Sequence, residues 1–77
     1  MKIEVLFFGQ LTDITGSSKL VIDYVDTTDN LKKIILEKFP ALSSLKFAIA
    51  VNKQMVTDNI SIAKNSSIAF MPPFSGG

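Results

Sequence analysis

The spacing of hydrophobic positions changes several times along the chain, and each change predicts a new element. Over residues 2–9, apolar and polar residues first alternate and then become apolar on both sides, as in a strand inside a sheet. A second alternating run covers residues 19–24, after a segment rich in glycine and serine. We therefore predict an N-terminal hairpin with a long loop, residues 10–18, in which Leu11 and Ile14 favour a single helical turn.

A helical spacing replaces the alternation after Thr27, whose side chain is suited to cap the first backbone amides. The apolar residues that share one face of this helix are Leu31, Ile34, Ile35 and Phe39. Because Pro40 disfavours a helical conformation of the residue before it, we expect the helix to end near Lys38.

Three more strands are predicted in the second half of the chain, after a connector at residues 40–46 with room for one turn. Residues 47–51 alternate large and small apolar side chains, and residues 54–56 read as a short edge strand. Asn52 and Lys53 would form the tight turn between them, although lysine is a poor second turn residue. Asn65 is the expected left-handed residue of the turn before the last strand, residues 67–71.

This order of strands around one long helix predicts an α+β fold in which a curled mixed sheet packs on one main helix, the β-grasp. We expect residues 1–71 to form this domain and residues 72–77 to form an extended, flexible C-terminal tail ending in Gly-Gly. A chain of 77 residues has room for one domain.

Composition removes most kinds of self-contained catalysis. Cysteine, histidine, tryptophan and arginine are all absent, which excludes disulfides, thiolate or imidazole metal sites and a histidine base. Eight lysines and seven acids give a net charge of +1, which does not indicate binding to nucleic acid or to a membrane surface. With no apolar stretch near the roughly 18 residues of a membrane span, a cytoplasmic location is expected.

The C-terminal segment is where chemistry is expected. It consists of Pro72, Pro73, Phe74, Ser75, Gly76 and Gly77. The prolines hold the chain extended, and the glycines, which lack a Cβ, allow a narrow channel of another protein to enclose the backbone. A carboxylate on Gly77 would need ATP for activation, and this chain has no phosphate-binding loop, so another protein would bind the nucleotide. Alternatively, the glycines are only a frayed terminus.

Three segments resemble the small subunits of molybdopterin synthase, a family of ubiquitin-like sulfur carriers with the β-grasp fold. The segments are VLFFGQL at residues 5–11, AVNKQMV at residues 50–56 and IAFMPPFSGG at residues 68–77. With the matching length and element order, the resemblance covers essentially the whole chain, and the closing motif is the most specific of the three.

The resemblance implies a definite reaction at Gly77. In this family an E1-like adenylyltransferase adenylates the terminal carboxylate with MgATP, and a persulfide donor then supplies sulfur to make a thiocarboxylate. The tail inserts into the large synthase subunit, in an expected heterotetramer with two copies of each subunit, and sulfur passes to a cyclic pyranopterin monophosphate to build the molybdopterin dithiolene. The chain would thus be a non-catalytic sulfur-donor subunit that binds no metal and no cofactor itself.

Alternation also predicts a docking surface. If Val5 and Phe7 face the helix, then Phe8, Met55 and Met71 point to the opposite side of the sheet and form an exposed apolar group. These positions match those at which the family places its partner contacts. One departure is Thr12, which stands where family members often carry a basic residue, so a salt bridge to a partner at that point is in doubt.

Three other functions remain open at this stage. The chain resembles carriers that supply sulfur to thiamine synthesis or tRNA thiolation in its Gly-Gly end, although the VNKQMV and FMPPFSGG segments favour the molybdopterin pathway. A ubiquitin-like modifier that forms isopeptide bonds would need the same adenylation. A passive β-grasp binding module would not need the terminal glycines at all.

Overall fold

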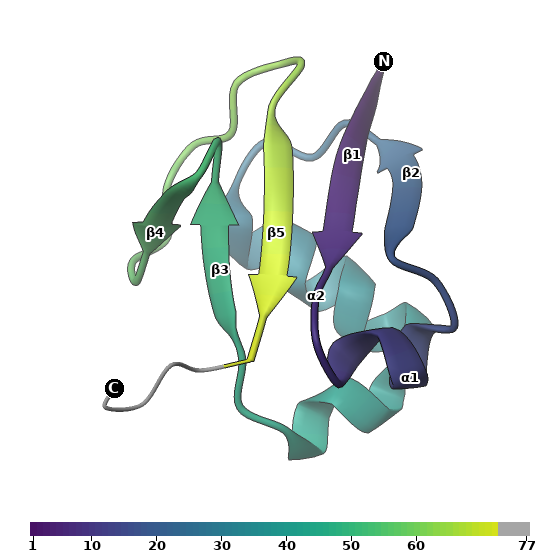
Figure 1. The fold of residues 1–77 in the computed structure, drawn as a ribbon. Coiled ribbons are helices and arrows are strands. Elements are labelled where there is room, and N and C mark those ends of the chain that lie inside the picture. The colour runs from purple at the N-terminus through teal and green to yellow at the C-terminus, as the bar shows by residue number, and fades with distance from the viewer. Residues whose placement is uncertain (73–77) are drawn as a thin grey trace.

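The computed structural model describes residues 1–72, in which strands and helices follow in nearly the predicted order (Figure 1). The elements are β1 (Lys2–Phe7), α1 (Leu11–Thr15), β2 (Lys19–Asp23), α2 (Thr28–Lys38), the 3-10 helix η1 (Pro40–Ser44), β3 (Ala48–Val51), β4 (Gln54–Val56) and β5 (Ser67–Met71). No helix within residues 1–72 is long and apolar enough to cross a membrane.

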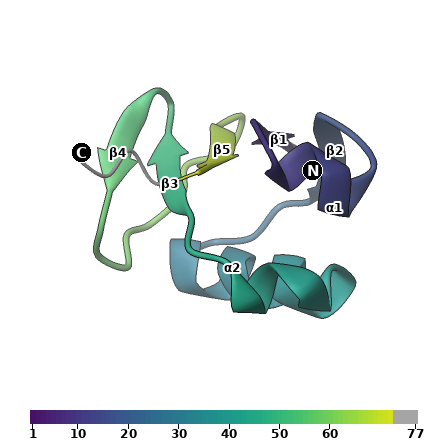
Figure 2. The same ribbon diagram turned by 60° about the horizontal axis from the view of Figure 1, so that its bottom comes forward.

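The five strands form one mixed sheet in the order β2-β1-β5-β3-β4. β1 runs parallel to β5 and antiparallel to β2, while β3 runs antiparallel to both β5 and β4. Figure 2 shows that α2 covers one face of this sheet. The predicted α+β architecture, a β-grasp with a mixed sheet on one main helix, is confirmed.

Alternation in β1 places its odd-numbered residues against the helix. Ile3, Val5 and Phe7 are buried, whereas Glu4 and Leu6 are half-buried on the other face. β5 repeats the pattern, with Ile68 and Phe70 completely buried. The remaining large buried side chains are Leu11, Ile22, Leu31, Ile35, Leu42, Ile49, Val51 and Ile62. One core therefore lies between the sheet and α2, which leaves the opposite face of the sheet open.

Helix α2 begins and ends where the sequence predicts. The Thr27 hydroxyl accepts a hydrogen bond from the Asn30 amide at 3.3 Å, and Lys38 is the last helical residue before Phe39. Of the predicted apolar face, Leu31 and Ile35 are fully buried, while Ile34 and Phe39 are half-buried at its edge.

The two long connections contain more structure than one turn each. Residues 10–18 include the five-residue helix α1, which buries Leu11 completely, and η1 buries Leu42 in the same way. Both short helices close the core at the end of the sheet where β1 leaves it. β3 begins one residue later than predicted, because Phe47 lies before the strand and packs its ring against Phe70, with 5.2 Å between ring centroids.

Candidate functional site

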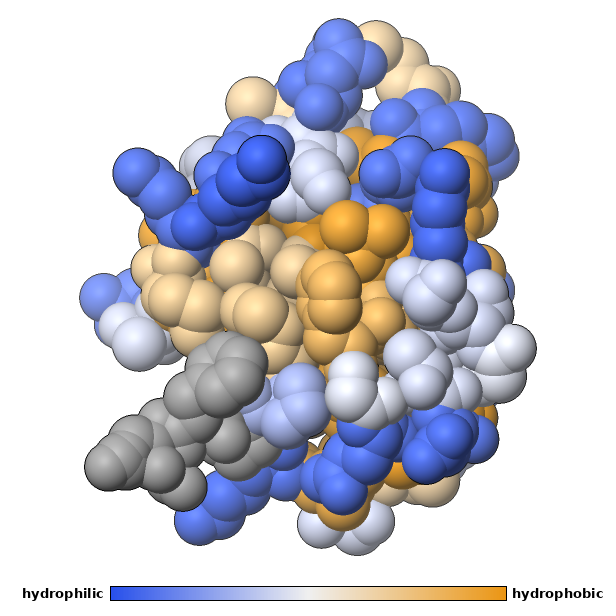
Figure 3. All heavy atoms as spheres, viewed as in Figure 1, coloured by the Kyte–Doolittle hydropathy of each residue, from blue (hydrophilic) through white to orange (hydrophobic). Residues whose placement is uncertain are grey.

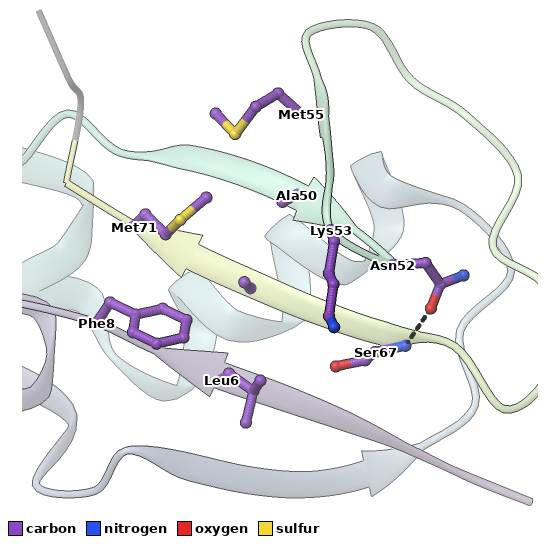
Figure 4. A pocket seen from close by; sticks show the side chains of 9 residues that line it. Leu6, Phe8, Ala50, Asn52, Lys53, Met55, Ser67 and Met71 are labelled. Carbon is purple, nitrogen blue, oxygen red and sulfur yellow. Dashed lines mark hydrogen bonds between the residues drawn. The ribbon is translucent and has the colours of Figure 1, made fainter.

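The face of the sheet opposite α2 carries an apolar groove. Figure 3 shows this face, with hydrophobic groups gathered at its centre and hydrophilic residues around them. The groove has a volume of about 490 Å³ and is lined by Leu6, Phe8, Ala50, Asn52, Lys53, Met55, Ser67, Ala69 and Met71. The three residues predicted to dock a partner, Phe8, Met55 and Met71, thus lie around one hollow (Figure 4).

The register of the strands explains the hollow. Ala50 of β3 lies opposite both Met55 of β4 and Ala69 of β5, and Ala69 pairs in turn with Leu6 of β1. Two alanines therefore form the floor in the middle of the sheet, and larger side chains on the flanking strands form the walls. Ala50 is 4% exposed on this open face because its neighbours cover it.

The walls remain accessible to a partner. Phe8 is 47% exposed and Met55 is 55% exposed, while Met71 is half-buried. Large apolar side chains with this much exposure, gathered around one hollow, are typical of an interaction surface. The flexible thioether of methionine lets such a surface fit more than one partner. The docking role of these three residues remains a prediction that the geometry permits.

Sequence reasoning missed Leu6, Lys53 and the polar end of the groove. Leu6 of β1 lies two residues before Phe8, so the alternation of side chains places both on the same face and was enough to find Leu6. The place of Lys53 at the groove was not predicted, because it depends on the geometry of the turn between β3 and β4 and on the distant strand β5. Neither relation is visible in a local pattern.

The β3–β4 turn is fastened to β5 at this polar end. The Asn52 amide donates to the Ser67 carbonyl at 2.8 Å. The Ser67 amide donates to the Asn52 side-chain oxygen at 3.0 Å, the bond drawn in Figure 4. Asn52 also donates through its side-chain nitrogen to the Ser66 hydroxyl at 3.4 Å. As predicted, Asn65 is left-handed, with φ 67°, and residues 52 and 53 form the tight turn, both with positive φ.

Charged residues lie on the same open face, along β1 and β2. Lys2 pairs with Asp23 at 2.5 Å, and Lys19 pairs with Glu4 at 3.1 Å. The hydrogen bond from Lys2 and then its positive charge lower the pKa of Asp23 below the ordinary value. Within residues 1–72, no group of three or more acidic side chains is placed to hold a metal ion.

The root of the predicted tail lies beside the groove. Pro72 follows Met71 directly, and a Cβ built on Gly9 would come within 2.7 Å of the Pro72 ring. Gly9 has φ +60°, so its left-handed backbone and its close approach to Pro72 both suit glycine. Thr12 has a local role here, because its hydroxyl donates to the Gly9 carbonyl at 2.8 Å.

The other tail residues lie outside the part of the chain that the structure describes. They are Pro73, Phe74, Ser75, Gly76 and Gly77, so their expected conformation and their insertion into a partner stay predictions. What the structure does fix is the last described residue, Pro72, at the exit from the central strand β5.

Comparisons with known proteins identify relatives over the whole chain. The sequence profile of the ThiS family matches residues 5–77. The molybdopterin synthase sulfur carrier subunit of Caenorhabditis briggsae is 34% identical over 83 aligned positions, covering 100% of this chain and 99% of that protein.

Solved structures add to the likeness. SAMP1 from Haloferax volcanii superposes with a TM-score of 0.81 at 22% identity and full coverage of both chains, which shows the shared fold. The complex of subunits 1 and 2 of molybdopterin-converting factor from Helicobacter pylori contains a chain that is 28% identical, again over 100% of both chains, with a TM-score of 0.73.

Proposed function

The chain belongs to the ThiS family, and on that premise we propose that it is the sulfur carrier subunit of molybdopterin synthase. One observation carries the proposal: 34% identity to a sulfur carrier subunit of that enzyme over the whole chain. The family match also continues through residue 77 and so includes the Gly-Gly segment. Because the chain has no cysteine, the transferred sulfur would be attached to the C-terminal carbonyl carbon and not to a side chain.

We infer that the reaction at Gly77 begins with activation. A carboxylate oxygen of Gly77 attacks the α-phosphorus of ATP, which an E1-like partner binds with Mg²⁺, and pyrophosphate leaves. The product is an acyl adenylate, whose carbonyl carbon accepts a nucleophile readily because AMP is a good leaving group. Gly76 and Gly77 carry no side chain, so the partner's channel can close around the backbone.

Sulfur then replaces AMP. The terminal sulfur of a persulfide donor attacks the acyl carbon, and AMP leaves. A thiolate then attacks the donor's sulfur in the resulting acyl disulfide, which forms a new disulfide with the donor and releases the thiocarboxylate. In the synthase, the thiocarboxylate sulfur bonds to a carbon of the cyclic pyranopterin monophosphate and displaces an oxygen there. Water then cleaves the resulting thioester, which restores the carboxylate and leaves the sulfur on the pterin. This chain contributes the acyl group and the route to it, residues 72–77, while its partners supply the catalytic side chains.

The groove is the proposed docking surface for the large subunit. It lies on the face where Met71 leads into Pro72, so a protein bound there is close to the tail root. The Helicobacter pylori structure, a complex of two subunits, supports a large-subunit partner of this kind. A lysine at a groove wall would bury a charge against apolar side chains, which is costly.

We therefore expect Phe8→Lys or Met71→Lys to weaken binding to the large subunit at least about tenfold, as central apolar anchors do. Val21→Lys is the matched control, because Val21 is 53% exposed on β2 and does not line the groove. Isothermal titration measures the affinity, and urea unfolding shows that each variant is folded. Unchanged affinity in both groove variants would contradict this docking surface.

The sulfur-carrier proposal is tested by trapping the thiocarboxylate. The chain is incubated with ATP, the E1-like enzyme and a persulfide source, alkylated with iodoacetamide, and digested with trypsin. Lys64 is the last lysine, so the C-terminal peptide is residues 65–77. Fragmentation must place the adduct on Gly77, because oxidation of Met71 resembles replacement of oxygen by sulfur in nominal mass. No adduct, with an enzyme that is active on a control carrier, overturns the proposal.

The acceptor of the sulfur separates the remaining alternatives. We expect the thiocarboxylated chain and the large subunit to convert the cyclic pyranopterin monophosphate to molybdopterin, which is detected by its fluorescent oxidation product. A carrier for thiamine or for tRNA thiolation would be loaded but would not support this conversion. A protein modifier would instead appear as conjugates of higher mass in cells.

A further inference from the structure

Lys53 holds a backbone conformation that lysine rarely adopts. Its φ is 72°, in the left-handed region, where the Cβ of an ordinary residue approaches the following carbonyl oxygen. The preceding Asn52 has φ 50°, so both central residues of the β3–β4 turn have positive φ. A hairpin turn of this kind favours glycine at its second position. Lysine therefore occupies a position where its own backbone is strained.

The turn that carries Lys53 is held in place from the side. Asn52 makes two hydrogen bonds to the backbone of Ser67, at 2.8 and 3.0 Å, and so attaches the turn to the start of β5. Because the turn cannot shift relative to the sheet without breaking these bonds, the origin of the Lys53 side chain is fixed. Figure 4 shows this side chain extending from the turn over β5, at one end of the groove.

The ammonium group of Lys53 is the positive charge among the groove-lining residues. Among residues 1–72 it forms no ion pair, and Glu4, an acid on the same face, is already paired with Lys19 at 3.1 Å. The other walls and the floor of the groove are apolar or uncharged. A cation at the end of an apolar hollow leaves a complementary position for one carboxylate.

We propose that Lys53 is a specificity-determining residue of the groove, which pairs with a carboxylate on the docked protein. The docked protein presents an apolar side chain to the hollow and an acidic side chain at the end near Asn52. This inference rests on the proposed function, in which the partner is the large synthase subunit. The pair selects between partners that offer the same apolar contact, because a protein with a basic or uncharged residue there loses the attraction.

The test compares three variants of the full chain in binding to the purified large subunit. Lys53→Glu reverses the charge. Lys53→Gly removes the side chain and relieves the backbone strain of the positive φ. Lys33→Glu is the control. Lys33 is an exposed residue of α2, on the covered side of the sheet, and its substitution gives the same change in net charge. Surface plasmon resonance gives association and dissociation rates at about 50 mM and about 500 mM NaCl, conditions in which screening differs strongly.

We expect Lys53→Glu to weaken binding about tenfold or more at low salt, mainly through slower association, and about twofold at high salt. Lys53→Gly should weaken binding about threefold while its urea midpoint stays equal to or above that of the unchanged chain. Lys33→Glu should bind within about twofold of the unchanged chain, since a distant exposed charge is screened.

Three outcomes decide against the inference. If Lys53→Glu and Lys33→Glu bind alike, the position of the charge does not matter. If Lys53→Gly loses both affinity and stability, Lys53 serves the turn and not the partner. If the unchanged chain does not bind the large subunit, both the proposed partner and the inference about Lys53 are wrong. The first two outcomes, in contrast, contradict the inference about Lys53 and leave the proposed partner in place.

Discussion

At the residue scale, the root of the tail depends on a contact that only glycine permits. Gly9 and Gly16 both have positive φ, +60° and +75°, but only Gly9 faces Pro72, and nothing lies within 4 Å of a Cβ built on Gly16. The two glycines therefore separate the cost of a left-handed backbone from the cost of a steric contact.

We expect Gly16→Ala to lower the free energy of unfolding by about 1 kcal/mol, the cost of a left-handed alanine. Gly9→Ala should cost about 1 kcal/mol more than that, because the methyl group also displaces the Pro72 ring. Urea unfolding measures both changes. Equal losses would mean that Pro72 moves aside without cost and does not fix the tail root.

The exposed pair of Lys2 and Asp23 makes a prediction about pH. Lys2 lowers the pKa of Asp23 in the folded chain, so the pair stabilises the fold above the pKa of the unfolded state. This contribution is lost as the pH falls through the lowered folded pKa. Because both groups are well exposed, the effect on stability is small and salt-sensitive.

We expect Lys2→Met to raise the pKa of Asp23 toward its ordinary value of 3.8, since both the hydrogen bond and the positive charge are removed. Lys19→Met should leave it in place, because Lys19 pairs with Glu4. Carboxyl chemical shifts followed by NMR between pH 2 and 6, a range that spans ordinary aspartate titration, measure both values. A pKa of Asp23 that stays low without Lys2 would contradict this cause.

At the element scale, the start of α2 is fixed from two directions. Thr27 caps it from the preceding chain, and Asn59, distant in sequence, accepts hydrogen bonds from the Asp29 amide at 2.9 Å and from the buried Thr28 hydroxyl at 3.4 Å. The Thr28 hydroxyl also accepts from the Ile60 amide at 3.0 Å. The loop before β5 thus attaches the helix to the edge of the sheet.

Asn59→Ala should lower the free energy of unfolding by about 1 to 2 kcal/mol. The substitution leaves the Asp29 amide at the helix start without its acceptor and removes one acceptor of the buried Thr28 hydroxyl. Thr57→Ala is the control, since within residues 1–72 the exposed Thr57 side chain makes no hydrogen bond. Thermal or urea unfolding of both variants measures the difference. Similar small losses would show that water replaces Asn59.

Elements with a strong local signal were predictable from the sequence. The Thr27 cap, the apolar face around Leu31 and Ile35, and the following Pro40 are local signals, and they locate both ends and the buried face of α2. Pairing between strands that are distant in sequence was not predictable in the same way, because the alternation within one strand does not determine which strand pairs with it. Alternation had already placed Phe8 and Met71 on the same face of the sheet. The register of β1 against β5, which sets the shape of the groove, and the place of Lys53 came only from the structure.

At the scale of the whole molecule, we expect the stability of the core and the proposed chemistry of Gly77 to be separable. Among residues 1–72, the buried cluster extends from Ile3 to Phe70. We expect deletion of Gly77 to leave the urea midpoint unchanged and to abolish thiocarboxylate formation, because the reacting carbonyl is then presented one residue too early. A large loss of stability would instead give the tail a structural role. Addition of one residue after Gly77 is the matched variant, with the same expected result.

The sheet order has a further consequence for how the chain acquires its structure during synthesis. β5 lies in the middle of the sheet and joins the β1–β2 hairpin to the β3–β4 hairpin, although it is the last strand along the sequence. Until residues 67–71 have left the ribosome, the two hairpins lack the strand that connects them. Pairing of β5 with the distant β1 is a non-local contact, and contacts of this kind form slowly. A chain interrupted before β5 therefore lacks the strand that joins its two hairpins. Under the proposed function it also lacks the carboxylate of Gly77, so it would not compete with the finished carrier for an activating enzyme.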